Sequence, residues 1–318
     1  TQNLPGKPED RELVAQAMGF GTFEAMAMEL DDHRQNVARH FEAVFADPNE
    51  KDHALDRVWH GAGDDNHAPE LLRLGFKDAA GVCARLAGIR AGSRYQQLAD
   101  SARGRFDALV PRLVEAAATL PDPDAALSRG LDLLEAISRR AAYLALLQQY
   151  PQALVKVAQI VGSSSWAASY LNRHPVLLDE LLDARLLDSA PDWPAFRAHL
   201  GRQLDEVEPD TERQMDLLRE AHHAQVFRLL TQDLSGLLTV ERLADHLSEL
   251  ADIMVDQALS HAWRKLLKRH VETPRFAVVS YGKLGGKELG YASDLDLVFL
   301  FDDPDPEAAQ VYAKLATR

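Results

Sequence analysis

Two aspartates near the end of the chain, Asp294 and Asp296, flank a single leucine in a strongly apolar segment. On a β-strand alternate side chains point to the same face, so both carboxylates would project together while Leu295 and Leu297 face the core. Two adjacent carboxylates repel each other unless a cation lies between them. Oxygen ligands at this spacing suit Mg²⁺, which binds through one or two carboxylates together with substrate phosphates. The spacing therefore predicts a metal site in which both aspartates are catalytic.

A glycine-rich loop, residues 282–286, precedes these carboxylates. Glycines without a Cβ let backbone N–H groups approach phosphate oxygens, lysines supply positive charge, and a serine hydroxyl donates a hydrogen bond. The candidate nucleotide-binding residues are Gly285, Gly286, Lys283, Lys287 and Ser293. Loop and carboxylates together predict in-line phosphoryl or nucleotidyl transfer with metal-held phosphates.

Each feature also has a structural interpretation. A glycine-rich segment between strands is often only a turn, and an Asp-x-Asp pair at a strand start is often solvated surface. The pattern is not a Walker loop, because no Gly-Lys-Ser/Thr closes it, and it is not a dinucleotide-binding fingerprint. The conjunction of glycine loop, acidic pair and apolar strand favours a catalytic site.

These residues require a strand–loop–strand unit to position them. Phe276–Tyr281 is a β-branched and aromatic run of strand length, and we expect the second strand over 294–301. Pro274 ends the preceding helix, and a short helical stretch precedes Arg318. A two-stranded unit is marginal by itself, so we expect more sheet beyond the end of this chain.

Most of the remaining sequence predicts helices. Apolar residues recur at intervals of three and four, which places them on one stripe of each helix. The predicted helical ranges are about 11–46, 79–91, 95–120, 124–147, 166–182, 211–230 and 239–266. The connections are short and rich in Pro, Asp, Ser or Gly, as between antiparallel bundle helices.

The predicted fold class is therefore mainly α: helical bundles followed by the beginning of an α/β domain. We expect a short helical segment over 1–46 and a charged linker over 47–67 that contains Gly61 and Gly63. The main helical bundle follows over 68–270, and the α/β part begins at 271 and runs to 318.

Composition narrows the class of protein. The 35 Lys and Arg against 49 Asp and Glu give a net charge of −14, which argues against a nucleic-acid partner. No apolar run approaches the roughly 20 residues that span a bilayer, and the polar N-terminus lacks a secretory signal, so we expect no membrane partner. The single cysteine, Cys83, cannot form an intrachain disulfide and indicates a cytoplasmic protein. Because the chain starts without methionine, we expect it to be part of a longer protein.

Residues 276–300 resemble the nucleotidyltransferase motif of the bifunctional glutamine synthetase adenylyltransferase/adenylyl-removing enzyme family. That family carries two domains of the DNA polymerase β-like superfamily, joined by a helical regulatory region. Residues 288–291 are more similar to the second, adenylylating copy than to the first. Weaker resemblance to the family's helical regions covers residues 33–41, 165–166, 173–175, 177–182, 214–219 and 245–250.

This resemblance assigns a role to each predicted segment. It implies that 1–46 is the helical tail of the removing domain, that 68–270 is the regulatory bundle, and that 271–318 opens the adenylyltransferase domain. The implied reaction transfers AMP from ATP to a tyrosine of glutamine synthetase, with pyrophosphate leaving, and the parent's other domain removes the group by phosphorolysis. Asp294 and Asp296 match the family's metal-binding carboxylates. The superfamily adds a third carboxylate from a later strand, so we expect little activity from this chain alone.

The resemblance also implies two protein partners, glutamine synthetase and the PII signal protein, and a role in regulating nitrogen assimilation. An alternative from another class is a non-catalytic helical module that couples two catalytic domains to a PII-type signal protein. A third interpretation is a nucleotidyltransferase that acts on another protein or on a small molecule.

Overall fold

The computed structural model of the chain describes residues 7–33, 55–61, 67–182, 189–267 and 269–317, and it divides into two compact units, 1–54 and 55–318. In the first unit α1 spans Pro8–Ala17 and a second helix covers residues 23–33. The backbone N–H of Phe23 donates to the Glu12 carboxylate at 3.1 Å, which ties the start of the second helix to the first. The rest of the expected helical tail, residues 34–46, lies outside the described residues.

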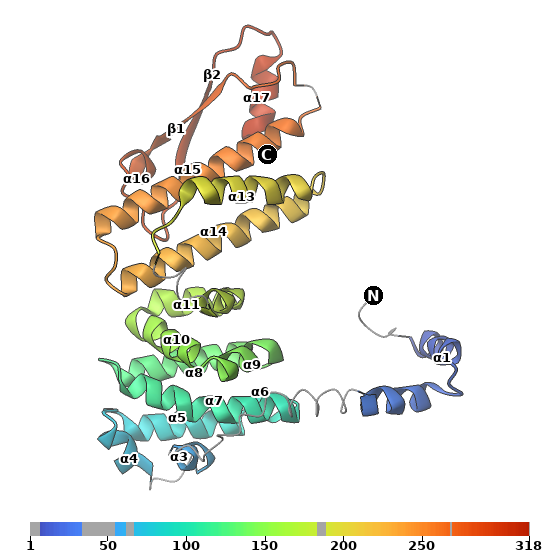
Figure 1. Ribbon diagram of the computed structural model, residues 1–318, viewed down its shortest axis with the longest axis vertical. Helices are drawn as coiled ribbons and strands as arrows, with labels where there is room; N and C mark the ends of the chain where they lie inside the picture. The colour runs from blue at the N-terminus through green and yellow to red at the C-terminus, as the bar shows by residue number, and fades with distance from the viewer. Residues whose placement is uncertain (1–6, 34–54, 62–66, 183–188, 268, 318) are drawn as a thin grey trace. The chain divides into compact units, whose positions relative to one another are not determined.

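The second unit is mainly α, as predicted, and Figure 1 shows its helices in successive layers that lead to the hairpin β1–β2. Its helical elements are α3 (Asp56–His60), α4 (Ala68–Arg73), α5 (Ala79–Ala91), α6 (Ser93–Gln96), α7 (Asp100–Ala118), α8 (Pro123–Ile137), α9 (Ala141–Gln149), α10 (Pro151–Ser163), α11 (Ser165–Arg173), the 3₁₀ helix η2 (Pro175–Leu182), α13 (Trp193–Glu206), α14 (Thr211–Leu234), α15 (Val240–Arg264), α16 (Gly282–Gly285) and α17 (Ala308–Ala316). None of the helices in the described part of the chain is both long enough and apolar enough to cross a bilayer.

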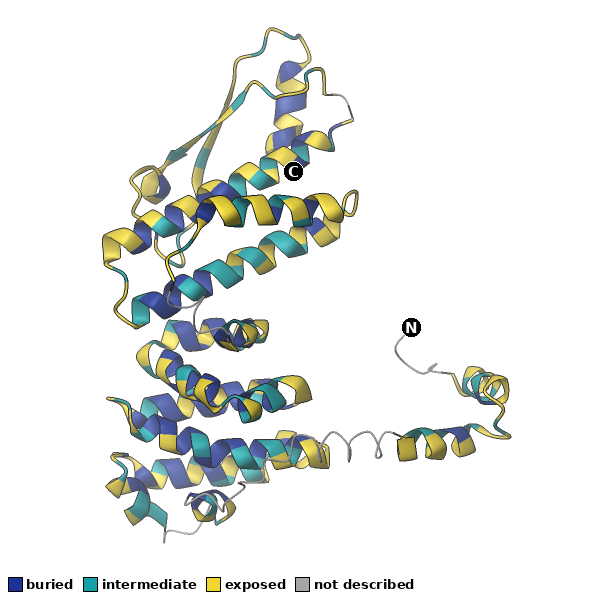
Figure 2. Cartoon of the chain, in the orientation of Figure 1, coloured by how far each residue is buried: buried dark blue, intermediate teal, exposed yellow. Residues whose placement is uncertain are grey.

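The first layers pack around α7, α8 and α10. Helix α8 begins where the sequence predicts, because the Asp122 carboxylate accepts a hydrogen bond from Ala125 N and Pro123 occupies the first turn. Its apolar stripe is fully buried, and Gly130 lies against the Leu113 side chain of α7. In Figure 2 buried and exposed residues alternate along these helices, as expected for amphipathic helices around a shared core.

Helix α3 lies inside the segment that the sequence predicts to be a linker. Trp59 is 1% exposed, and its indole N–H donates to the Asp107 carboxylate of α7 at 2.8 Å. Tyr95 donates to the same carboxylate at 2.6 Å and packs edge-on against Trp59. The described residues 55–61 therefore belong to the bundle, because an apolar patch of Leu55, Val58 and Trp59 outweighs the polar composition around it. Residues 47–54 and 62–66 lie outside the described residues.

In the second unit, three predicted helices are interrupted. The predicted helix 124–147 ends at Ile137 and restarts at Ala141, where the Ser138 hydroxyl donates back to the Glu135 carbonyl at 2.8 Å. The range 166–182 divides before Pro175, which cannot continue an α-helix, and η2 follows. Similarly, 95–120 becomes the end of α6 and the longer α7.

Both predicted strands are present, and the second begins at residue 296, two residues later than predicted. Strand β1 spans Phe276–Tyr281 and pairs antiparallel with β2, which spans Asp296–Phe301, in a register that sets Tyr281 opposite Asp296. The hairpin and α17 belong to the same compact unit as the helices. Near the end of α15 a small second cluster forms, in which Trp263 stacks on Tyr312 of α17 at 5.6 Å.

Candidate functional site

The two predicted catalytic carboxylates lie at the loop end of the hairpin. Asp296 is the first residue of β2, whereas Asp294 precedes the strand, and both side chains are exposed. Leu297 is partly buried and packs on the main core, but Leu295 is 39% exposed, contrary to the predicted alternation. The reason is that the pleat begins only at Asp296, so Leu295 lies outside it.

The Asp296 carboxylate lies against Gly282, the first residue of the glycine loop. Gly282 has φ +53°, a conformation that favours glycine, and a Cβ at this position would overlap the Asp296 carboxylate. A Cβ at Gly285 would lie 2.6 Å from the Ser280 carbonyl oxygen. These two glycines are thus required by close approaches within the hairpin itself. Gly282 is not among the predicted binding residues, although its position directly after a strand is a signal that marks it.

The remaining predicted binding residues surround this point. Lys283 is exposed on α16, and Gly286 caps that short helix through its N–H to the Gly282 carbonyl at 3.0 Å. Lys287 is exposed and has φ +53°, which is unusual for a residue with a side chain. The Ser293 hydroxyl accepts a hydrogen bond from Gly290 N at 3.0 Å, so in this structure it holds a turn.

The loop also faces helix α15. Burial raises the pKa of Asp252 above its usual value, Glu249 adds to this effect, and the positive charge of Lys287 opposes it. Lys287 thus lies within electrostatic reach of an acidic patch on α15.

Two leucines fix this loop to the helical bundle. Leu284 is 5% exposed and Leu289 is 7% exposed, and both belong to the main core that begins at Leu55. Tyr291 follows them and reaches the helices as well. The lysines and carboxylates are thus exposed on a loop whose apolar residues are buried, so the polar groups stay accessible while the backbone is held.

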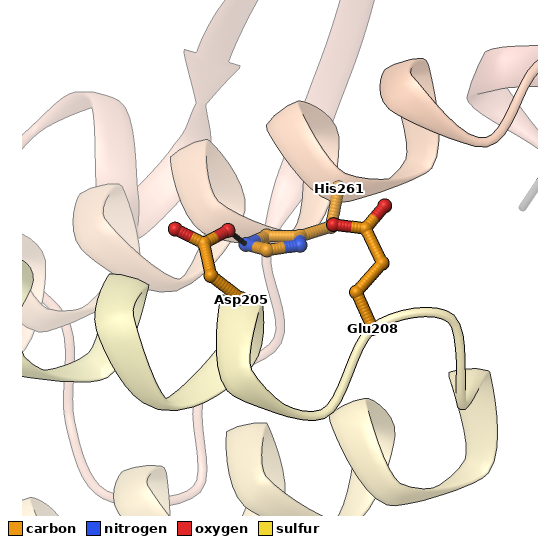
Figure 3. Close-up of side chains that lie close together, drawn as sticks. All are labelled: Asp205, Glu208 and His261. Atoms are coloured by element: carbon orange, nitrogen blue, oxygen red, sulfur yellow. Dashed lines mark ion pairs between the residues drawn. The ribbon is translucent and has the colours of Figure 1, made fainter.

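A second group of chemically suitable residues lies elsewhere, between α13 and the end of α15. Asp205, Glu208 and His261 each offer one ligand atom within 4.8 Å of the others, and Figure 3 shows the two carboxylates on either side of the imidazole. However, Arg264 contacts Asp205 at 2.7 Å and Glu208 at 3.7 Å. Burial lowers the pKa of His261, and the Arg264 charge lowers it further. The guanidinium already neutralises the carboxylates, so we interpret the group as an ion-pair corner. No local sequence signal links His261 to the two acids.

A cavity of about 590 Å³ lies among η2, α13 and α14. It is bordered by the ion pair of Arg228 with Glu180, whose atoms are 2.7 Å apart. None of the predicted site residues lines this cavity, so its size does not bear on the loop chemistry.

The arrangement at the hairpin fits a hard divalent cation and phosphates. Asp294 and Asp296 supply only oxygen ligands, and the exposed backbone of Gly285 and Gly286 is within the same loop. Lys283 and Lys287 add positive charge, and among the described residues neither forms an ion pair with the loop's own carboxylates. The whole group is exposed and so open to a large ligand.

Comparison with known proteins relates this chain to one family. The family model described as glutamate-ammonia ligase adenylyltransferase matches residues 154–318. A bifunctional glutamine synthetase adenylyltransferase/adenylyl-removing enzyme from Aromatoleum aromaticum is 61% identical over the whole chain, which covers 34% of that relative. Enzymes with the same name from Chromobacterium violaceum and Neisseria meningitidis serogroup B are 50% and 52% identical, again over the whole chain and 36% of each relative. The chain thus spans about a third of the length of these curated relatives.

Proposed function

Because this chain belongs to the glutamate-ammonia ligase adenylyltransferase family, we propose that it contributes the opening of a nucleotidyltransferase site that moves AMP from ATP to a tyrosine of glutamine synthetase. The observation that carries the proposal is the position of the Asp296 carboxylate directly against Gly282, at the start of the glycine loop. Asp296, one of the two predicted metal ligands, therefore lies at the start of the candidate phosphate-binding loop, and Asp294 precedes it by two residues.

In the proposed reaction, the tyrosine oxygen forms a bond to the α-phosphorus of ATP. The bond from that phosphorus to the oxygen bridging the α- and β-phosphates breaks, pyrophosphate leaves with the electron pair, and the phenolic proton passes to solvent. Asp294 and Asp296 would hold Mg²⁺, which when bound neutralises phosphate charge and polarises the α-phosphoryl group. Gly285 and Gly286 carry no Cβ and would let phosphate oxygens approach the loop backbone. The Gly286 N–H, which donates to the Gly282 carbonyl in this structure, would have to exchange that partner for phosphate.

The test uses the full-length parent enzyme with Asp294→Asn and Asp296→Asn combined. Loss of both anionic ligands removes several kcal/mol of transition-state stabilisation, so transfer of labelled AMP to glutamine synthetase should fall roughly a thousandfold. Mass spectrometry of the wild-type product should locate AMP on a tyrosine. The matched control is Asp302→Asn, an exposed aspartate at the other end of β2, which should leave transfer within about twofold of wild type. Transfer by the double variant at more than a tenth of the wild-type rate would contradict the proposal.

The helical bundle has a second candidate role, as a module that couples catalytic domains to a PII-type signal protein. The observation that favours it is the shared core, in which Leu284 and Leu289 of the loop pack with the helices. The same double aspartate variant separates the two roles. It should lose transfer yet still bind a PII-type protein in a pull-down, and loss of that binding would mean that the aspartates are structural.

A further inference from the structure

Tyr291 connects the loop that carries the carboxylates to two helices of the bundle. Its hydroxyl donates a hydrogen bond to the Asp233 carboxylate of α14 at 2.9 Å. Its ring stacks on Trp166 of α11, with the ring centroids 5.1 Å apart and the planes at 27°. A stacked ring and a charge-assisted hydrogen bond fix both the position and the rotation of the phenol.

Trp166, on which the Tyr291 ring stacks, is fixed by further contacts within the helices. Trp166 stacks in turn on Tyr170 at 4.9 Å and 17°. Tyr170 is 6% exposed, and its hydroxyl forms a hydrogen bond with Nδ1 of His223 on α14 at 2.6 Å. Trp166 is therefore part of an aromatic stack anchored on α11 and α14, and it offers Tyr291 a fixed contact surface.

A short hydrogen-bonded turn connects Tyr291 to the two carboxylates. The Ser293 hydroxyl accepts from Gly290 N at 3.0 Å, and Ser293 N donates to the Gly290 carbonyl at 3.1 Å. These two hydrogen bonds close a turn around Tyr291, and Asp294 follows the turn directly. Since only one residue separates Asp294 from the start of β2, a fixed Tyr291 ring restricts where both carboxylates can lie.

The chemistry of Tyr291 excludes a direct role as nucleophile or base. Burial raises the pKa of its hydroxyl far above the usual value, and the hydrogen bond to Asp233 raises it further. The hydroxyl therefore stays protonated and acts as a donor toward Asp233. Its contribution would come through geometry, because a displacement of metal ligands by about 1 Å is enough to slow a positioned reaction.

We propose that Tyr291 is a positioning residue for AMP transfer, which clamps the turn before Asp294 and Asp296 against Trp166 and Asp233. This inference rests on the proposed function of the two aspartates. It predicts that loosening the clamp lowers kcat and weakens the apparent affinity for Mg²⁺ while leaving recognition of the protein substrate unchanged.

The experiment measures AMP transfer to glutamine synthetase by the full-length parent enzyme carrying Tyr291→Phe or Tyr291→Ala. The Phe variant keeps the stack and loses the donor, so kcat should fall about tenfold, as for loss of a hydrogen bond to a charged group. The Ala variant loses both contacts, and kcat should fall by roughly a hundredfold or more. In both, the Mg²⁺ concentration at half-maximal rate should rise, whereas KM for glutamine synthetase should stay within about twofold.

Two further variants make the readout specific. Asp233→Asn retains an oxygen acceptor and should keep kcat within a few-fold of wild type, whereas Asp233→Ala should match Tyr291→Phe. The control is Tyr143→Phe on α9, a partly buried tyrosine that Arg140 covers at 5.9 Å and that is remote in sequence from the loop. It should change neither kcat nor the Mg²⁺ dependence.

The outcomes separate this inference from the proposed function. If Tyr291→Phe keeps the wild-type kcat and Mg²⁺ dependence while the double aspartate variant is inactive, the proposed positioning role of Tyr291 is wrong. The proposed catalytic role of the two aspartates is then still supported. If the double aspartate variant remains active, the site itself is wrong. Should Tyr291→Ala fail to fold, as judged by circular dichroism, the Tyr291→Phe and Asp233→Ala pair decides.

Discussion

At the residue scale, Asp303 is the acidic group most completely enclosed by partners near the hairpin. Its side chain is 3% exposed, His270 Nε2 donates to it at 2.8 Å, and the Tyr312 hydroxyl donates at 2.8 Å. The backbone N–H of Asp305 is the largest influence and, with the Tyr312 hydroxyl, lowers the pKa of Asp303 to about 2, although burial opposes the shift. Asp303 thus ties residue 270 and α17 to the end of β2.

This depressed pKa predicts a stability change in acid. Because the folded protein binds the Asp303 proton less tightly than the unfolded chain does, the stabilising effect is full above about pH 4 and is lost as the pH falls toward 2. Urea unfolding followed by tryptophan fluorescence should show wild type more stable than Asp303→Asn at pH 6. The difference in urea midpoint should shrink as the pH falls from 4 toward 2. A difference that stays constant over that range would show that Asp303 acts through packing alone.

At the scale of elements, two helical glycines predict opposite responses to the same substitution. Gly104 in α7 is exposed, and an added Cβ would meet nothing within 4 Å. Gly104→Ala should therefore stabilise the protein by about 0.5–1 kcal/mol, because alanine loses less backbone entropy in a helix. A Cβ at Gly130 in α8 would lie 2.8 Å from Leu113 Cδ1, so Gly130→Ala should destabilise by about 1–3 kcal/mol through overpacking.

Guanidinium unfolding followed by circular dichroism measures both variants. Each glycine is the other's control, since the chemical change is identical and only the neighbouring helix differs. Equal shifts of the midpoint for the two variants, in either direction, would contradict the close packing of α7 against α8.

Sequence patterns predicted elements well where one local signal dominates. Phe276–Tyr281 forms the predicted strand, and α5 spans the predicted range 79–91. The patterns did not single out α10, whose residues Ala153, Leu154, Val157 and Ile160 are all buried. The period of 3.6 residues is nevertheless present in this segment, because its polar residues Gln152, Lys156, Gln159 and Ser163 recur at intervals of four, three and four, and Pro151 marks the helix start.

For the candidate site, the sequence predicted that the acidic pair follows a glycine loop in one strand–loop–strand unit. The hairpin register sets Tyr281 opposite Asp296, which lies against Gly282. Their metal and nucleotide roles remain proposals. The sequence could not predict that Tyr291 would meet Asp233 and Trp166, because these partners are distant along the chain and only packing joins them.

At the scale of the whole molecule, one apolar core extends from Leu55 of α3 to Leu289 of the loop. Trp59 is buried in this core and Trp166 packs against it, while Trp263 belongs to the separate cluster with α17. Residues joined by a continuous core unfold cooperatively, because breaking it at one end exposes apolar surface at the other.

Single-tryptophan variants should therefore divide into two classes in urea unfolding. In the protein that retains only Trp59 and the protein that retains only Trp166, with the others changed to Phe, the fluorescence transition should coincide with the circular dichroism transition of the same variant. The variant with only Trp263 reports the smaller cluster, which buries less apolar surface and should lose its signal at the same or lower urea concentration. A Trp166 transition at a lower urea concentration than the circular dichroism transition of the same variant would mean that the loop-bearing helices unfold apart from the first layers. In that case the bundle could not hold Tyr291 as rigidly as the shared core implies.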